Sequence, residues 1–286
     1  MTAIRAGRGL GDSLYLQSIV RFLVGRGESV DVYSDWPDVF RPLGERVAVH
    51  PFRRGAVDRV AHYVTRKTVS GTTQFQDMCI HAGLPSNIDL RLDWVRRGGG
   101  IADQVERSAG DLPIVLVQMP REPFGREDGF GRDLLPKCTV IQQVLDRLKG
   151  RAFLVEIGAG ETKFEFSGID CDLRNKTRVS ELLDLASLVD GCVGYCSFIV
   201  PLAESLGKPE LLVWSRRGLN SATDYVRSIT PKKIIHRPDL SRAVIDDCTD
   251  DELSEATDAF YREVGGRASV RRQARGSGGE WPRCAA

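Results

Sequence analysis

The chain has 286 residues, of which 42% are hydrophobic and 28% charged, and its 40 basic residues nearly balance its 39 acidic ones. This length suits two domains better than one core, and the near-zero net charge does not call for a nucleic-acid or membrane partner. No apolar run is long enough to cross a bilayer, and the opening residues, MTAIRAGRGLGDSL, lack the apolar core of a secretory signal. We therefore expect a cytoplasmic protein without stable membrane insertion.

The cysteines and histidines do not predict a metal site. Seven cysteines are scattered along the chain, and the four histidines stand far apart. Cys192 and Cys196 are close in sequence, but no second Cys or His pair lies near them to complete a zinc tetrahedron. We expect reduced thiols, no metal and no cofactor.

The first half of the chain predicts alternating strands and helices. A short strand over 2–6 leads through a glycine-rich loop into a helix beginning near Leu14, and a second strand follows over 29–33. The pattern is weaker from 53 to 97, where it indicates strands over 59–65 and 87–94 and a helix over 74–82. A buried strand over 113–118 and a helix over 140–148, closed by Gly150, complete this half.

The second half repeats the alternation. Strands are predicted over 153–157, 191–195 and 210–214, and helices over 180–188, 197–206 and 250–264. Thr249 and Glu252 form a capping box for the last helix. Alternation of this kind is typical of parallel sheets covered by helices, and clefts at the carboxyl ends of such strands bind ligands.

These patterns predict an α/β fold with two Rossmann-like domains that face each other across a cleft. We place the N-terminal domain at 1–149 and the C-terminal domain at 150–265. The remaining residues, 266–286, are rich in Arg and Gly, and this composition predicts a disordered tail.

The most informative segment runs from Asp172 to Ser215, DLRNKTRVSELLDLASLVDGCVGYCSFIVPLAESLGKPELLVWS. It places the hydroxyl of Ser197 at the predicted start of a helix, where free backbone N–H groups can bind a diphosphate. On the residues alone, a simple helix-capping role for Ser197 is an equal alternative.

This segment resembles the donor-binding half of ADP-heptose:lipopolysaccharide heptosyltransferases, which have the GT-B fold. The matching residues are Asp172-Leu173, Lys176-Thr177, Asp190, Val193-Gly194, Ser197, Leu202-Ala203 and Leu206-Gly207-Lys208-Pro209. Cys196, Phe198 and Pro201 stand where the family has aspartate, glycine and histidine. The resemblance implies a nucleotide-sugar donor site that includes Cys196, Ser197 and Phe198, and the departures imply a donor other than ADP-heptose or a contact supplied from elsewhere.

The loop Gly9-Leu10-Gly11-Asp12-Ser13-Leu14 resembles the opening of the family's acceptor domain. Glycines such as Gly9 and Gly11 let the backbone approach a ligand. Asp12 either caps the helix, where the dipole favours an anion, or acts as the general base that deprotonates the acceptor hydroxyl. The resemblance implies the catalytic role.

Three further groups are weaker candidates. Arg121 and Arg126 follow the strand over 113–118 and could hold a phosphate or an acidic sugar on the acceptor side, or could belong to a solvated loop. Thr162 and Lys163 follow the strand over 153–157 at the place of the family's donor-phosphate loop. Arg216 follows the strand over 210–214, where a family loop borders the nucleotide.

The leading hypothesis is an inverting, metal-independent glycosyltransferase that moves a sugar from a nucleotide-diphosphate sugar to a hydroxyl acceptor. A glycan and a modified nucleic-acid base in DNA are both open as the acceptor. Two alternatives keep the fold: a nucleotide-sugar epimerase or hydrolase, and a non-catalytic nucleotide-sugar-binding protein.

Overall fold

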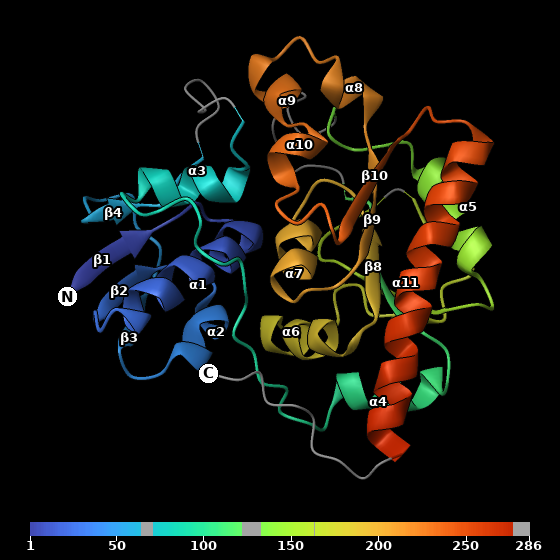
Figure 1. The fold of residues 1–286 in the computed structure, drawn as a ribbon, viewed down its shortest axis with the longest axis horizontal. Coiled ribbons are helices and arrows are strands. Elements are labelled where there is room, and N and C mark those ends of the chain that lie inside the picture. Colours follow the sequence, from blue (N-terminus) through green and yellow to red (C-terminus); the bar gives the residue numbers. More distant parts are fainter. Residues whose placement is uncertain (64–70, 122–132, 163, 277–286) are drawn as a thin grey trace.

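The computed structural model describes residues 1–63, 71–121, 133–162 and 164–276. Within these residues the chain forms two parallel β-sheets covered by helices, and the two α/β halves lie side by side (Figure 1). The first sheet has the strand order β3-β2-β1-β4, and the second has the order β10-β9-β8-β5-β6-β7. The predicted α/β class with two Rossmann-like units is confirmed.

The first sheet contains β1 (Thr2–Arg5), β2 (Val30–Tyr33), β3 (Val47–His50) and β4 (Arg59–Val60). Its core-facing residues include Ile4, Val30 and Val32, each at most 1% exposed. Helix α1 (Leu10–Gly25) crosses from β1 to β2, as the sequence predicts. The short elements α2 (Pro37–Phe40) and η1 (Arg41–Leu43) lead into β3, which was not predicted, and α3 (Gln74–His81) lies within the predicted helix at 74–82.

The predicted strand at 87–94 is wrong, because this segment lies along α1 and pairs with no strand. The side chain of Gln17 bonds both the N–H and the carbonyl of Asp93, each at 2.9 Å. The hydroxyl of Ser18 does the same for Arg91, at 3.1 and 2.8 Å. Alternate residues are buried, which explains the strand-like pattern: Ile88, Leu90 and Leu92.

The second sheet contains β5 (Ile114–Gln118), β6 (Phe153–Ile157), β7 (Cys171–Asp172), β8 (Gly191–Gly194), β9 (Glu210–Trp214) and β10 (Ser241–Ile245). The predicted domain boundary at 149/150 assigned β5 to the first domain. In the structure β5 pairs with β6 on one side and β8 on the other, so it lies at the centre of the second sheet. The division between the sheets therefore falls between β4 and β5. All five residues of β5 are buried, as expected for a central parallel strand covered by helices on both faces of its sheet.

Helices cover both faces of the second sheet. The longer ones are α4 (Ile101–Ala109), α5 (Cys138–Leu148), α6 (Val179–Leu188), α7 (Ile199–Ser205) and α11 (Asp250–Gly276). Three short helices, α8 (Arg216–Leu219), α9 (Asp224–Ser228) and α10 (Pro231–Ile234), connect β9 to β10. None of the helices in the described ranges is both long and apolar enough to span a membrane.

The predicted end of the last helix at 264 and the predicted disorder from 266 are wrong as far as 276. Helix α11 continues to Gly276 and runs beside α5 along the second sheet (Figure 1). Val264 and Ala268 are fully buried, and Arg271 forms an ion pair with Asp190 at 2.9 Å, both side chains being 4% exposed. These positions share one helical face, which the Gly- and Arg-rich composition concealed. Residues 277–286 lie outside the described ranges.

Helices α1 and α7 join the two halves. A Cβ atom at Gly11 would lie 3.3 Å from both Phe198 Cα and Pro201 Cγ, so glycine permits this close approach. An ion pair between the buried Asp77 and the partly buried Lys233, at 2.5 Å, adds a second contact between the halves. Phe198 and Pro201, which depart from the family pattern, thus form part of the contact between the halves.

Candidate functional site

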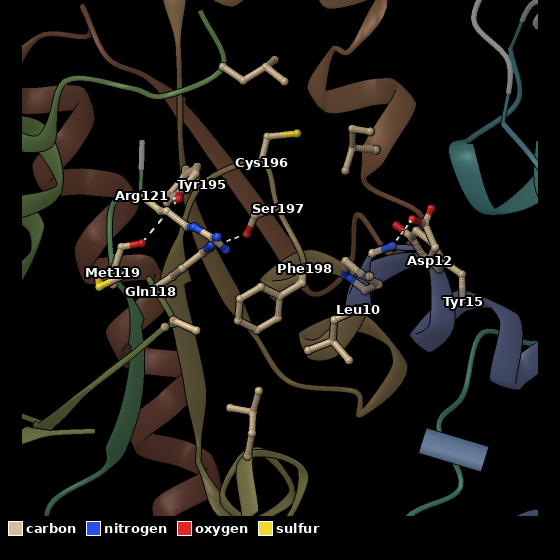
Figure 2. A pocket seen from close by; sticks show the side chains of 18 of the residues that line it. Leu10, Asp12, Tyr15, Gln118, Met119, Arg121, Tyr195, Cys196, Ser197 and Phe198 are labelled. Atoms are coloured by element: carbon tan, nitrogen blue, oxygen red, sulfur yellow. Dashed lines mark hydrogen bonds between the residues drawn. The ribbon is translucent and has the colours of Figure 1, made fainter. Parts of the chain in front are cut away.

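A cavity of about 640 Å³ lies between the two halves, and Figure 2 shows part of its lining. In each sheet it meets the point where the strand order reverses, between β1 and β4 in the first sheet and between β5 and β8 in the second. Loops that leave the carboxyl ends of parallel strands in opposite directions open a crevice at such a point, where α/β proteins bind ligands. Two crevices therefore merge into one cavity.

Asp12, with Gly9 and Gly11, lines the wall from the first half, as the sequence predicts. Its Oδ2 atom accepts the N–H of Gly9 at 3.0 Å, and its carboxyl is also hydrogen-bonded by Tyr63. Burial raises the pKa of Asp12, and the two hydrogen bonds and the nearby His62 oppose this change. A desolvated carboxyl with a raised pKa is a stronger proton acceptor than one in water.

Arg121 lines the opposite wall, and its backbone N–H donates to the Tyr195 hydroxyl at 3.1 Å. Burial lowers the pKa of Arg121. The predicted acceptor-side position of Arg121 is corrected here, because the residue follows β5 and therefore belongs to the second half. Arg126, predicted beside it, lies outside the described residues.

The turn from β8 to α7 brings Cys196, Ser197 and Phe198 to the cavity, as predicted. The Ser197 hydroxyl bonds Oε1 of Gln118 and accepts the N–H of Ile199 at 3.3 Å. The hydroxyl thus links the first residue of α7 to the last residue of β5 by hydrogen bonds. Burial raises the pKa of Cys196 to about 12, so its side chain is a neutral thiol.

Two other predicted donor residues, Thr162 and Arg216, do not line the cavity. Thr162 closes a local turn, in which its hydroxyl donates to the carbonyl of Phe164 at 3.0 Å, whereas Gly158 and Ala159 from the same loop do line the cavity. Arg216 lies in a separate surface groove, paired through two hydrogen bonds with Asp247 at 2.8 and 3.0 Å. Lys163 lies outside the described residues.

Sequence reasoning missed Arg178, an exposed residue that lines the cavity immediately before α6. Its backbone N–H donates to Glu181 at 2.8 Å, which caps the helix. Among the described residues its guanidinium has no carboxylate partner. Its position directly after Lys176-Thr177, within the motif that carries the family resemblance, was a signal that could have identified it.

Aromatic and apolar side chains complete the cavity near Asp12. They come from α1, from the residue directly before α2 and from the segment after β4: Leu10, Tyr15, Trp36 and Tyr63. Such a wall suits the apolar face of a sugar ring or of a base. The sequence alone did not mark these residues, because their side chains meet only when the first sheet is formed.

No protein-family model matches the sequence, and no curated protein sequence matches it. Solved structures do. A glycosyl transferase family 9 protein of Veillonella parvula is 7% identical with a TM-score of 0.60, covering 91% of this chain and 97% of that one. The ADP-heptose lipopolysaccharide heptosyltransferase II of E. coli is 12% identical with a TM-score of 0.58, covering 92% and 99%. Both confirm the predicted fold.

A third similar structure is the iron-containing heptosyltransferase TibC of enterotoxigenic E. coli in complex with ADP-D-β-D-heptose. It is 12% identical with a TM-score of 0.55, covering 95% of this chain and 76% of that chain. The described part of the present chain holds no group of three His, Cys, Asp or Glu residues that could bind a metal. The three similar structures together show that the chain has the fold of GT-B glycosyltransferases and structurally resembles the heptosyltransferases.

Proposed function

We propose that the protein is an inverting glycosyltransferase that moves a sugar from a nucleotide-diphosphate sugar to a hydroxyl acceptor. One observation carries the proposal: a single cavity of about 640 Å³ has a desolvated carboxyl, Asp12, on one wall and two guanidinium groups, Arg121 and Arg178, on the other. Glycosyl transfer to a hydroxyl needs a proton acceptor on one side of the sugar and stabilisation of a departing diphosphate on the other.

The second half would bind the donor. Arg121 and Arg178 present forked donors that suit phosphate oxygens, and Thr177 and Val179 place the beginning of α6 at the same wall. The positive end of that helix favours a bound anion. The TibC complex with ADP-D-β-D-heptose supports a donor of this chemical class.

The proposed reaction is a single displacement. Asp12 takes the proton of the acceptor hydroxyl, and the oxygen forms a bond to the anomeric carbon as the bond from that carbon to the diphosphate oxygen breaks. The nucleoside diphosphate leaves with the electron pair, and Arg121 and Arg178 balance its charge. Attack from the face opposite the leaving group inverts the anomeric configuration.

We also propose that turnover needs no divalent metal, because the two guanidinium groups supply the positive charge at the leaving group. Treatment with EDTA should leave the rate unchanged. A loss of activity that Mg²⁺, Mn²⁺ or Fe²⁺ restores would contradict this.

The acceptor is a hydroxyl on a glycan or on a modified nucleic-acid base. The aromatic wall formed by Trp36 and Tyr63 beside Asp12 supports either, since both present a flat apolar face. A panel containing glycans, hydroxymethylated DNA and the free modified nucleoside distinguishes them by which one gains sugar mass.

The decisive experiment incubates the purified protein with ADP-, UDP- and GDP-linked sugars and the acceptor panel. We expect acceptor-dependent release of nucleoside diphosphate and a product of inverted anomeric configuration by NMR. Release without acceptor would identify a nucleotide-sugar hydrolase, and a changed donor sugar would identify an epimerase. Donor binding by thermal shift without any turnover would identify a binding protein.

A further inference from the structure

The carboxyl of Asp12 lies against two glycines of the loop after β1. A Cβ atom at Gly7 would lie 2.7 Å from Asp12 Cγ, and one at Gly9 would lie 2.8 Å from Asp12 Oδ2. Carbon atoms do not approach so closely, so any larger residue at either position would displace the carboxyl. Only hydrogen atoms at both positions leave room for the observed orientation.

Two donors hold the carboxyl in this space. The N–H of Gly9 reaches Oδ2 at 3.0 Å, and the Tyr63 side chain supplies the second hydrogen bond. Tyr63 follows β4, which pairs in parallel with β1 through Ile4 and Arg59, so the segments after both strands meet at the same edge of the sheet. The titratable groups that face Asp12 are Tyr63 and His62, both from the segment after β4.

We propose that Tyr63 is a positioning residue for Asp12: its hydroxyl fixes one orientation of the carboxyl inside the glycine loop and so directs the free acceptor position of Asp12 into the cavity. The inference rests on the proposed function, in which Asp12 accepts the proton of the acceptor hydroxyl. Tyr63 donates its hydrogen bond throughout and takes no proton itself.

The hydrogen bond from Tyr63 affects both the orientation and the protonation of Asp12. A general base must point at the proton that it removes, and a freely rotating carboxylate in a large cavity spends little time in that orientation. A hydrogen bond to the charged form also keeps the carboxyl ionised against the effect of burial, which would otherwise favour the protonated form. Tyr63 therefore serves both the geometry and the protonation state of Asp12.

The first test measures the carboxyl directly, without any substrate. Aspartate labelled with ¹³C at the carboxyl is incorporated, and the Asp12→Asn spectrum identifies the Asp12 signal. We expect Tyr63→Phe to raise the pKa of Asp12, because a donor to the charged form is lost while the aromatic ring remains. Tyr33→Phe is the matched control, since Tyr33 ends the neighbouring strand β2 and bonds Arg53 at 2.7 Å outside the cavity.

The second test uses turnover. In Tyr63→Phe the acid limb of the kcat/KM profile should move to higher pH, and kcat should fall roughly tenfold with little change in KM. Gly9→Ala should also lower kcat, because the backbone at φ −68° and ψ 152° accepts alanine and the new Cβ meets the carboxyl.

The outcomes distinguish the positioning role of Tyr63 from the proposed role of Asp12 as the general base. If the pKa of Asp12 responds to His62→Gln but not to Tyr63→Phe, or responds equally to Tyr63→Phe and Tyr33→Phe, the positioning role is overturned. If Asp12→Asn retains full turnover, the proposed base fails. The labelled carboxyl then still decides whether Tyr63 controls Asp12.

Discussion

The two sheets contribute the same topological feature to the cavity and opposite chemistry. In each sheet the loops beside the point of strand reversal form the wall. The first half places a carboxyl there, Asp12, and the second half places guanidinium groups, Arg121 and Arg178. The comparison teaches that topology determines where a site forms, whereas the loop residues determine what it does.

The two walls also differ in how their functional groups are held. Asp12 lies between glycines and accepts two hydrogen bonds, whereas the guanidinium of Arg178 is exposed and has no carboxylate partner in the described part of the chain. A base must be aimed at one proton, but a charge that balances a diphosphate acts over several ångströms. We therefore expect substitutions around Asp12 to reduce activity more than substitutions of the arginines on the second wall.

The largest expected effect is the loss of the base. Asp12→Asn keeps the size of the side chain but removes the proton acceptor, so kcat should fall about 10² to 10⁴-fold while donor binding remains. Steady-state kinetics together with a thermal shift against the donor measure both. Asp35→Asn is the control, because Asp35 pairs with Arg8 at 2.8 Å and does not line the cavity. Equal activity losses in the two variants would contradict a catalytic role for Asp12.

The next largest effect is on stability, and it comes from the ion pair between Arg271 and Asp190 in the second half. Arg271→Ala leaves the buried Asp190 with the N–H of Ile114 but without its ion-pair partner, and we expect the free energy of unfolding to fall by about 3–5 kcal/mol. Urea denaturation measures this change. Arg272→Ala provides the control, since Arg272 is only partly buried and bonds a carbonyl at the surface. If Arg271→Ala lowers the free energy of unfolding no more than Arg272→Ala, the ion pair between Arg271 and Asp190 does not stabilise the second half.

The second wall itself should respond more mildly than Asp12. Removal of one of two cations leaves the other, so Arg178→Ala should lower kcat/KM about tenfold to a hundredfold, and Arg178→Lys should recover part of the loss. Arg216→Ala should change nothing, because Arg216 is paired with Asp247 away from the cavity. Greater damage from Arg216→Ala would return the donor site to the position that sequence resemblance suggested.

The smallest effect is a pH dependence of stability. Burial raises the pKa of Glu204 from 4.5 to about 7, so the folded chain retains a proton that the unfolded chain has released. Stability is therefore greatest below about pH 4.5 as far as this group is concerned, and it falls as the pH rises towards 7. Glu204→Gln should give a shallower fall in Tm over this interval. An unchanged slope would show that Glu204 does not titrate there.

Much of the second half could be predicted from the sequence. The strands β6 and β9 were predicted with their observed ends, because each is a run of five mostly apolar residues, FLVEI and ELLVW. Asp12, Ser197 and Phe198, which the sequence singles out because a motif coincides with a helix start, line the cavity in the structure.

The rest depended on contacts between distant segments. The run at β5 indicates a buried strand, but nothing in its periodicity says which sheet it joins, and this error also placed Arg121 on the wrong wall. Tyr63 has no sequence signal as a partner of Asp12, because the pairing of β4 with β1 alone brings them together. The predicted last helix ends too early, because the Gly- and Arg-rich composition after 264 indicates disorder. The helical spacing of Val264, Ala268 and Arg271 on one buried face points to a longer helix.

The close approach at Gly11 has a consequence for recombination between related chains. The cavity exists only where both halves meet, and they meet through a surface on which one hydrogen atom faces Phe198 and Pro201. A foreign second half could bring its own donor preference, but only if its α7 presents a matching shape at these two positions. Exchange of specificity by swapping halves therefore depends on the fit between α1 and α7 at Gly11 as well as on the residues that line the cavity.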